Sequence, residues 1–501
     1  MSQSSYRTIL RSSSIIGGAQ LVSVAAGIAK MKAVAILLGP AGVGLYGLYL
    51  GLIQTASTIA SMGIGNAGTR QIAAAFSEGG DEGVERARDS LVLGATLLAL
   101  LGAIIFWVAS GWIADVVFED QRRSTDIAWL SLGVALTVIA GSQAALLTGL
   151  RRVGDLARIN ISASIIGGGA GVLAVFFLGA EGLVAMILVV PAVTFLISHV
   201  YVSRVGPIWV SRISMRQLWH EWRGMITLGF AFMLSFLAST LGHLVARTVV
   251  QRELGAEALG HFQAAWSIGM TYLGFVLVAM GTDYFPRLTA VINDRTTAGR
   301  VVNEQTEIML MLCAPVLLAM QGLAPWVIRS LYSVEFESAT EILRWQLLGD
   351  ILKVMSWPLG YLIMASGAGK TFVLTESLGM GVFVVSVAIG LPMIGINATG
   401  VGFLVMYAVY LPMVRWFCGR SVGFYWSVAV KKQAGRVIAA MLLVFTAANW
   451  SEQVGAVLGV GLAGAYGLWA FTRLISILEV RGRLECIAGF GEKVRRWMIG
   501  G

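Results

Sequence analysis

Charged residues are scarce in this sequence, at 13% of 501 residues, whereas ordinary soluble domains carry about 25%. Hydrophobic residues make up 57%. This balance excludes a soluble globular protein. The formal net charge of +9 comes from basic residues in short segments between apolar stretches, the pattern that orients a membrane protein. We therefore expect no nucleic-acid partner.

Cysteine and histidine are also scarce. The cysteines Cys313, Cys418 and Cys486 are scattered and have no histidine at metal-ligand spacing. The four histidines form no cluster; they are His199, His220, His243 and His261. We expect no disulfide framework, no metal site, no cofactor and no catalytic residue.

Long apolar windows dominate the sequence. Because a membrane-spanning helix needs about 20 mostly apolar residues, the windows predict an all-α polytopic membrane protein. About 14 spans are expected, at 12–38, 43–66, 90–112, 127–150, 157–179, 183–203, 224–250, 257–281, 305–328, 340–366, 371–391, 396–414, 434–450 and 454–476. The stretch 434–450 has only about a dozen continuously apolar residues, so 12 or 13 spans stay open.

Basic residues predict the orientation of these spans. With the N-terminus in the cytoplasm, 27 lysines and arginines lie on the cytoplasmic side, six outside and three within spans. By the positive-inside rule, we expect both termini to be cytoplasmic.

An internal repeat relates two parts of the chain. A shift of 216 residues superposes LGPAGVGLYGL after the first span on LGAEALGHFQA after the seventh. Gly39 then meets Gly255 and Gly44 meets Gly260. Six crossings separate the two copies, which predicts two six-helix lobes in parallel orientation with a substrate site between them. The expected parts are an N-terminal lobe at 1–203, a basic cytoplasmic linker at 204–223, a C-terminal lobe at 224–415, and two added helices with a basic tail at 416–501.

The stretch KMKAVAILLGPAGVGLYGLYLGLIQTASTIASMGIGNAGTRQIA, from Lys30 to Ala73, resembles the start of the Wzx-type flippases. These O-antigen and lipid III translocases form the polysaccharide transporter family of the MOP superfamily. The resemblance implies a MATE-like fold and alternating access in a bacterial inner membrane. The implied cargo is an undecaprenyl-pyrophosphate-linked oligosaccharide carried to the outer leaflet among membrane lipids. The implied partners are a polysaccharide polymerase and a chain-length regulator.

Four basic residues are candidates for binding the pyrophosphate, since a cation inside a membrane is costly unless it serves a pathway. Lys32 lies seven residues before Gly39, where the resemblance also places a lysine, and Arg247 lies eight before Gly255. We expect these two to face each other across a cavity, with Arg252 nearer its outer mouth. Lys30 points about 200° away from Lys32. The alternative for all four is that they reach the lipid headgroups.

Hydroxyl and amide side chains follow one face of the second span, at the i, i+3, i+4, i+7 spacing of Gln54, Ser57, Thr58 and Ser61. They are candidates for contacts with sugar hydroxyls. Packing between helices is the alternative.

Three further charged residues lie within spans. Asp350 and Lys353 are three residues apart on one helical face, and Glu376 lies in the next span. Ion coupling is one role for them. Mutual neutralisation of Asp350 and Lys353, and an interfacial position for Glu376 near Lys370, are the alternatives.

Three other functions stay open on the sequence. A membrane-embedded polysaccharide polymerase or glycosyltransferase needs a catalytic acid or histidine, usually on a sizeable loop, and no external loop here exceeds about 20 residues. A cation-coupled multidrug antiporter and a peptidoglycan-precursor flippase belong to the same superfamily. Cations within the spans favour an anionic, lipid-linked cargo over a cationic drug.

Overall fold

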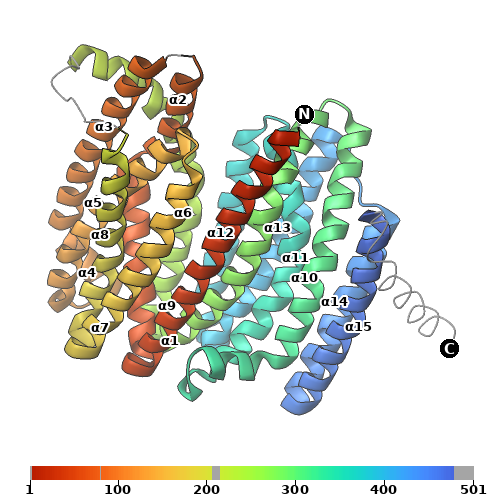
Figure 1. Cartoon of the computed structure of the whole chain (residues 1–501). Helices are drawn as coiled ribbons and strands as arrows, with labels where there is room; N and C mark the ends of the chain where they lie inside the picture. Colours follow the sequence, from red (N-terminus) through yellow and green to blue (C-terminus); the bar gives the residue numbers. More distant parts are fainter. Residues whose placement is uncertain (1–2, 79, 206–214, 479–501) are drawn as a thin grey trace. The chain divides into compact units, whose positions relative to one another are not determined.

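The computed structural model describes residues 3–78, 80–205 and 215–478. Within these ranges the chain is helical and contains no strand (Figure 1). The helices are α1 (Gln3–Ser61), α2 (Ile64–Glu78), α3 (Gly80–Val108), α4 (Ser110–Phe118), α5 (Ser124–Gly149), α6 (Val153–Ser162), α7 (Gly168–Leu178), α8 (Gly182–Ser203), α9 (Met215–Val291), α10 (Arg295–Leu331), α11 (Ala339–Ala365), α12 (Gly369–Ile394), α13 (Ala398–Val422), α14 (Val428–Trp450) and α15 (Glu452–Leu478).

Helical stretches of membrane-spanning length occur throughout the described part of the chain. Eight are long and apolar enough to cross a bilayer, and three of these have 45, 51 and 54 residues. Those three are about twice the length that one crossing needs. Helix α14 is not among the eight, in keeping with the short apolar run at 434–450.

The two longest helices each contain one residue with non-helical backbone. In α1 this residue is Gly39, with φ 62° and ψ −167°, and in α9 it is Gly255, with φ 85° and ψ −179°. Such angles are essentially restricted to glycine, because a Cβ would clash with the backbone. The predicted breaks between spans one and two and between spans seven and eight therefore occur at repeat-equivalent glycines.

Two compact units make up the fold. The first contains residues 1–263 and 331–335, and the second contains 264–330 and 336–501. The division into 1–203, 204–223, 224–415 and 416–501 stays a prediction. Residues 206–214 of the expected basic linker and 479–501 of the expected tail lie outside the described residues.

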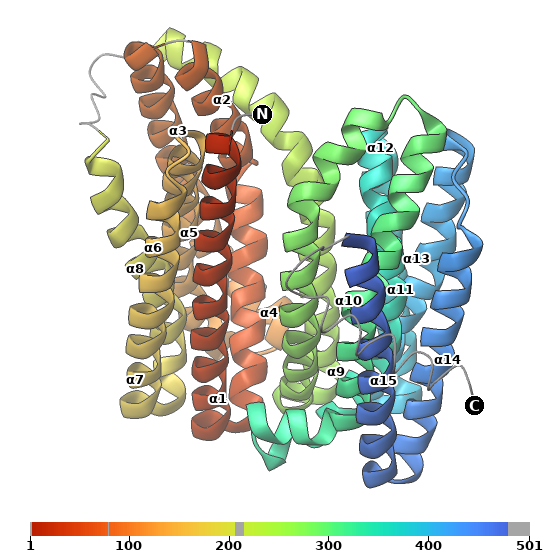
Figure 2. The same cartoon turned by 45° about the vertical axis from the view of Figure 1, so that its right-hand side comes forward.

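Helix α5 is central to the first unit. It packs against α2, α3 and α8, and α8 in turn packs against α7 (Figure 2). Ile72 of α2, Leu91 of α3 and Leu146 of α5 are fully buried in one apolar cluster. At the start of α9, Trp222 donates a hydrogen bond of 3.0 Å to the carbonyl of Ser90, which fastens this helix to α3.

Helix α13 is central to the second unit, where it packs against α11 and α12, while α14 packs against α15 (Figure 1). The Trp266 ring lies 5.9 Å from that of Phe383 and 5.6 Å from that of Phe403. Helix α10 begins after Asp294, whose carboxylate accepts hydrogen bonds from the backbone N–H groups of Thr296 and Thr297. Further bonding by the Thr297 hydroxyl lowers the pKa of Asp294 below its usual value.

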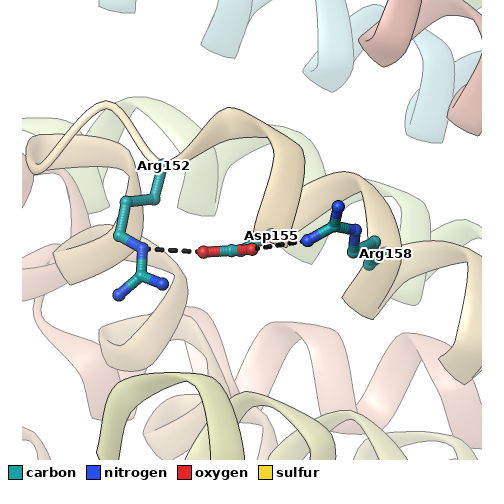
Figure 3. A network of polar contacts seen from close by, with 3 residues as sticks. All are labelled: Arg152, Asp155 and Arg158. Atoms are coloured by element: carbon teal, nitrogen blue, oxygen red, sulfur yellow. Dashed lines mark hydrogen bonds and ion pairs between the residues drawn. The ribbon is translucent and has the colours of Figure 1, made fainter. Parts of the chain in front are cut away.

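The turn between α5 and α6 carries three of the basic residues assigned to the cytoplasmic side. Arg151 has a positive φ of 56°. Arg152 and Arg158 flank the carboxylate of Asp155, with nitrogen–oxygen distances of 2.7 and 3.2 Å (Figure 3). The single carboxylate offsets only one of the three positive charges, so this segment keeps a net positive charge, the feature on which the predicted orientation rests.

Candidate functional site

A cavity of 490 Å³ with both polar and apolar lining residues lies within the first unit. Its wall is formed by the end of α1, the turn into α2, one face of α5 and two residues of α9. The lining residues are Gln54, Ser57, Thr58, Ser61, Gly63, Ile64, Gly65, Asn66, Thr69, Thr137, Val138, Gly141, Ser142, Ala144, Ala145, Thr148, Met233 and Phe236. The volume is within the range of about 300–1,000 Å³ that is usual for small-molecule sites.

The four polar residues expected on one face of the second span all line this cavity; they are Gln54, Ser57, Thr58 and Ser61. The Thr58 hydroxyl donates to the carbonyl of Gln54 at 2.8 Å, and the Ser61 hydroxyl donates to the carbonyl of Thr58 at 3.2 Å. Packing between helices, the alternative considered for this face, still fits Ser57, which is only 7% exposed, whereas Gln54, Thr58 and Ser61 are partly or fully exposed.

The α5 side of the cavity was not predicted. Thr137, Gly141, Ala144 and Thr148 of α5 line it at intervals of three and four residues, which places them on one helical face. This spacing of small and hydroxyl residues is visible in the sequence. It does not by itself predict a cavity wall, because the face carries no charge and merges with the apolar span.

Arg247 of α9 lies against the same face of α1. A Cβ added at Gly51 would lie 2.9 Å from the Arg247 Nη1 atom, and the buried Nε atom has no hydrogen-bond partner. Gly51 and Gln54 are one helical turn apart, so the guanidinium lies about 5 Å along the α1 axis from the Gln54 end of the cavity. A cation with an unused donor thus adjoins a cavity whose lining residues are uncharged.

The other predicted cations have different surroundings. Lys30 donates to the hydroxyl of Tyr46 at 2.7 Å, and Arg252 forms an exposed ion pair with Glu119. Lys32 has an exposed side chain on α1. The residues that line the cavity include none of the four predicted cations. The expected apposition of Lys32 and Arg247 stays a prediction.

Repeat-equivalent residues contact each other in the first unit, just after the two kinks. A Cβ on Gly44 would overlap the carbonyl oxygen of Ala256, and a Cβ on Gly260 would overlap that of Pro40. Since Pro40 and Ala256 are also 216 residues apart, the contact is reciprocal under the repeat. Three residues further on, Gly47 lies against the side chain of Gln263. The α1 face therefore carries, in order, a close backbone contact, Arg247 and the cavity.

A second polar cluster lies within the second unit, on α11, α12 and α13. Asp350 is fully buried, and neither of its carboxylate oxygens has a hydrogen-bond partner. The Lys353 ammonium lies 3.2 Å from the sulfur of Met270 and 5.8 Å from the centre of the Phe403 ring. Glu376 accepts a hydrogen bond from the Tyr410 hydroxyl.

This arrangement bears on the alternatives considered for the three charged residues. The Asp350 oxygens have no hydrogen-bond partner, so Lys353 does not form a hydrogen-bonded ion pair with them, and neutralisation through the charges alone stays an alternative to ion coupling. Glu376 is half-buried and bonded to Tyr410 of α13, which is not the environment of a headgroup-facing side chain. No group of three or more His, Cys, Asp or Glu residues suited to a metal ion occurs in the described ranges.

Comparisons with known proteins identify the family. The model of the polysaccharide biosynthesis protein family matches residues 9–291. The lipid III flippases of Escherichia coli strain K12 and of Shigella flexneri are each 25% identical to the chain over 401 residues, which cover 78% of this chain and 94% of the relative.

Solved structures of similar fold are membrane transporters. The lipid II flippase MurJ in an inward closed conformation has a TM-score of 0.70 at 13% identity, covering 91% of this chain and 98% of that one. An inward-facing multidrug resistance MATE family transporter of the MOP superfamily has a TM-score of 0.66 at 17% identity, covering 82% and 96%.

These findings confirm two predictions from the sequence. The all-α, polytopic, MOP-type fold is the fold of the structural neighbours. The resemblance carried by Lys30 to Ala73 is borne out by the family match and by the relatives. The chain is a multi-pass membrane protein that belongs to the polysaccharide biosynthesis protein family.

Proposed function

We propose that this protein is a flippase, which moves an undecaprenyl-pyrophosphate-linked oligosaccharide, such as an O-antigen or related surface-polysaccharide unit, from the cytoplasmic to the outer leaflet. The relatives named lipid III flippase support a lipid-linked cargo. Transport requires no bond to be broken, so the proposal assigns no catalytic residue. The protein lies in the bacterial inner membrane with both termini in the cytoplasm.

The observation that carries this proposal is the position of the cavity beside Arg247. A lipid-linked glycan has an anionic pyrophosphate joined directly to a polyhydroxylated sugar. Moving either part through hydrocarbon without polar partners costs several kcal/mol or more. Arg247 offers an unpartnered guanidinium donor, and the cavity one turn away offers hydroxyl and amide groups. The order of these groups along α1 matches the order of the two parts in the cargo.

Lys32 is the proposed second cation for the pyrophosphate, since its side chain is exposed on α1. Lys30, which donates to the Tyr46 hydroxyl, and Arg252, which forms an exposed pair with Glu119, are proposed to have secondary roles. The polymerase that extends the glycan and the regulator of its chain length are the proposed protein partners.

The cluster in the second unit is the proposed site of ion coupling. A buried carboxylate without a hydrogen-bond donor is costly in its charged form, and binding a cation or a proton relieves that cost. Asp350 is such a group, and Lys353 and Glu376 lie on the same and the adjacent helix. Cation binding at Asp350 would bias the conformation of α11, and movement of that cation down its gradient would supply the energy for transport.

A test in cells uses a strain that lacks this gene and measures lipid-linked oligosaccharide in each leaflet. We expect the oligosaccharide to accumulate on the inner leaflet and the wild-type gene to relieve the accumulation. Arg247→Ala should fail to relieve it, whereas Arg287→Ala, which removes an arginine of the same helix from an exposed ion pair with Asp283, should retain most of the function.

An absence of accumulation, with unchanged surface glycan, would overturn the flippase proposal. The cation-coupled drug antiporter would then be the function to test, by drug susceptibility of the same strain. Rescue by Arg247→Ala at the wild-type level would retain the flippase but remove Arg247 from its binding site.

A further inference from the structure

A basic residue of the second unit continues the face of α13 that is exposed along its length. The exposed side chains of this face recur at i, i+4, i+7, i+11 and i+15; they are Val405, Val409, Pro412, Trp416 and Arg420. Four of the five are apolar, so in a multi-pass membrane protein this face contacts lipid. Arg420, in the last turn of α13, therefore extends toward the membrane at the end of a span. From such a position an arginine can reach the headgroups.

Helix α14 repeats this arrangement at its first turns. With α15, it forms one edge of the second unit (Figure 1). The exposed residues Val428, Lys432, Ala439 and Leu442 follow one face at i, i+4, i+11 and i+14, and Lys432 is the only charged residue of the four. The connector between α13 and α14 has five residues, so the ends of the two helices lie within roughly 20 Å of each other.

The connector itself is held in place and presents an aromatic ring. Phe424 and Trp426 are buried, with ring centres 4.9 Å apart, whereas Tyr425 between them is 72% exposed. Asn303 of α10 fixes the backbone, since its Oδ1 atom accepts from the Ser427 N–H at 2.7 Å and its amide donates to the Tyr425 carbonyl at 3.1 Å. The exposed Tyr425 ring is therefore a fixed feature of this surface.

The charge around the connector has one sign. No aspartate or glutamate occurs between Glu376 and Glu452, whereas five basic residues do; they are Arg415, Arg420, Lys431, Lys432 and Arg436. The Arg420 guanidinium lies 4.3 Å from the centre of the Trp416 ring, which is 51% exposed. Within the described part of the chain, neither Arg420 nor Lys432 forms an ion pair. This surface thus combines unneutralised cations with aromatic rings suited to the membrane interface.

We propose that Trp416, Arg420, Tyr425 and Lys432, together called the α13–α14 surface, bind anionic phospholipid through its headgroup phosphate. Charge complementarity carries the choice of occupant, because the surface is cationic and faces lipid at the ends of two spans. In the orientation proposed above, the lipid belongs to the cytoplasmic leaflet. Orientation of the chain needs only charge, whereas the stacked Trp416 ring and the fixed Tyr425 ring give this surface a defined shape. The inference concerns the surrounding membrane and is independent of the cargo.

The test measures lipid binding to the full-length protein in detergent by native mass spectrometry. Phosphatidylglycerol and phosphatidylethanolamine with the same acyl chains are titrated separately. We expect the wild type to bind the first phosphatidylglycerol about tenfold more tightly than phosphatidylethanolamine, because cations favour the lipid with net negative charge. The double variant Arg420→Gln with Lys432→Gln should lose about tenfold or more in phosphatidylglycerol affinity, since each basic residue near an anionic surface contributes about fivefold.

Two further variants separate a built surface from bulk charge. Trp416→Leu keeps every charge and should weaken phosphatidylglycerol binding about threefold, through loss of the cation–π contact. Arg300→Gln with Lys370→Gln is the matched control, because it removes two exposed basic residues of the same unit outside the α13–α14 surface. This control should bind phosphatidylglycerol as tightly as the wild type.

Three results would overturn the proposal. The first is equal affinity of the wild type for the two lipids. The second is a control variant that loses as much affinity as the α13–α14 double variant, because bulk charge would then explain the binding. The third is a dimer of the wild type that the double variant loses, without any preference for phosphatidylglycerol, which would assign the surface to contact between two copies of this chain.

Discussion

Gly44 and Gly260 approach each other so closely that a Cβ on Gly44 would lie 2.7 Å from the backbone nitrogen of Gly260. The two residues are 216 positions apart, which is the repeat shift found in the sequence. Equivalent parts of the two copies thus meet through their backbones. A contact of this kind leaves no room for any side chain, so it requires glycine on both sides.

Alanine at either position should weaken this contact. We expect Gly44→Ala and Gly260→Ala each to destabilise the protein by about 1–3 kcal/mol, because added methyl groups force backbone shifts in packed regions. Thermal unfolding in detergent measures the effect. Gly435→Ala is the matched control, since its Cβ meets no atom within 4 Å. An unfolding temperature for both variants equal to that of the control would contradict the close contact.

A second prediction concerns the backbone conformation at the kinks, where a side chain would cause strain without a steric clash. A Cβ at Gly255 has no neighbour within 4 Å, so Gly255→Ala isolates the cost of the φ of 85°. We expect destabilisation of about 1–3 kcal/mol from that strain. Gly169→Ala, in regular helix and equally uncrowded, should instead be neutral or slightly stabilising. If chemical denaturation gave Gly255→Ala a higher free energy of unfolding than Gly169→Ala, the kink would not depend on glycine.

Gly51→Ala tests whether the placement of the Arg247 guanidinium matters, as distinct from its charge. The added methyl group would lie 2.9 Å from Nη1 and displace the guanidinium from α1. We expect the flipping rate of Gly51→Ala to fall about tenfold, because a misplaced charge-assisted hydrogen bond loses roughly 1.5–3 kcal/mol. Arg247→Ala, which removes the guanidinium, should abolish flipping. Rates in reconstituted vesicles give the comparison. Equal rates for Gly51→Ala and the wild type would show that the contact has no functional role.

Asp350→Asn should raise the stability of the folded protein and at the same time remove the coupling of flipping to an ion gradient. Replacing a buried, unpartnered carboxylate by an amide removes a desolvation cost, so we expect the variant to unfold at a higher temperature than the wild type. At the same time, flipping should lose its response to an imposed proton or sodium gradient. Both are measured on the same reconstituted preparation. A variant that is less stable and keeps its gradient response would exclude Asp350 from coupling.

The ion pair of Arg252 and Glu119 should contribute little. Its side chains are 44% and 56% exposed, and exposed pairs are worth about 0–1 kcal/mol. A double-mutant cycle with Arg252→Ala and Glu119→Ala, followed by thermal unfolding, should give a coupling energy below about 1 kcal/mol. A value of several kcal/mol would give this pair a structural role that its exposure does not suggest.

Much of the fold could be predicted from the sequence, because its strongest signals are local. Apolar windows identify helices by length alone, and the glycines at 39 and 255 identify the breaks through the repeat. Only one of the two main walls of the cavity could be predicted from the sequence. The face from Gln54 to Ser61 has helical spacing and polar side chains, whereas its partner face on α5 is recognisable only once tertiary packing opposes the two.

The individual surroundings of the charged residues could not be predicted for the same reason. Nothing in the local sequence shows that Lys30 bonds to Tyr46, that Arg252 pairs with Glu119 across 133 positions, or that Arg247 lies against Gly51. Each of these contacts joins residues on different helices or on the two halves of a kinked one. They depend on how the helices pack, which periodicity does not specify.

Direct transport in a purified system tests the central claim. Vesicles containing the purified protein would be loaded with a fluorescent undecaprenyl-pyrophosphate oligosaccharide, and a membrane-impermeant reagent would report the fraction that reaches the opposite leaflet. We expect the wild type to equilibrate the substrate within minutes, Arg287→Ala, which breaks an exposed ion pair of the same helix, to behave similarly, and Arg247→Ala to resemble protein-free vesicles. Wild-type vesicles that moved the substrate no faster than protein-free ones, under any imposed proton or sodium gradient, would contradict the account.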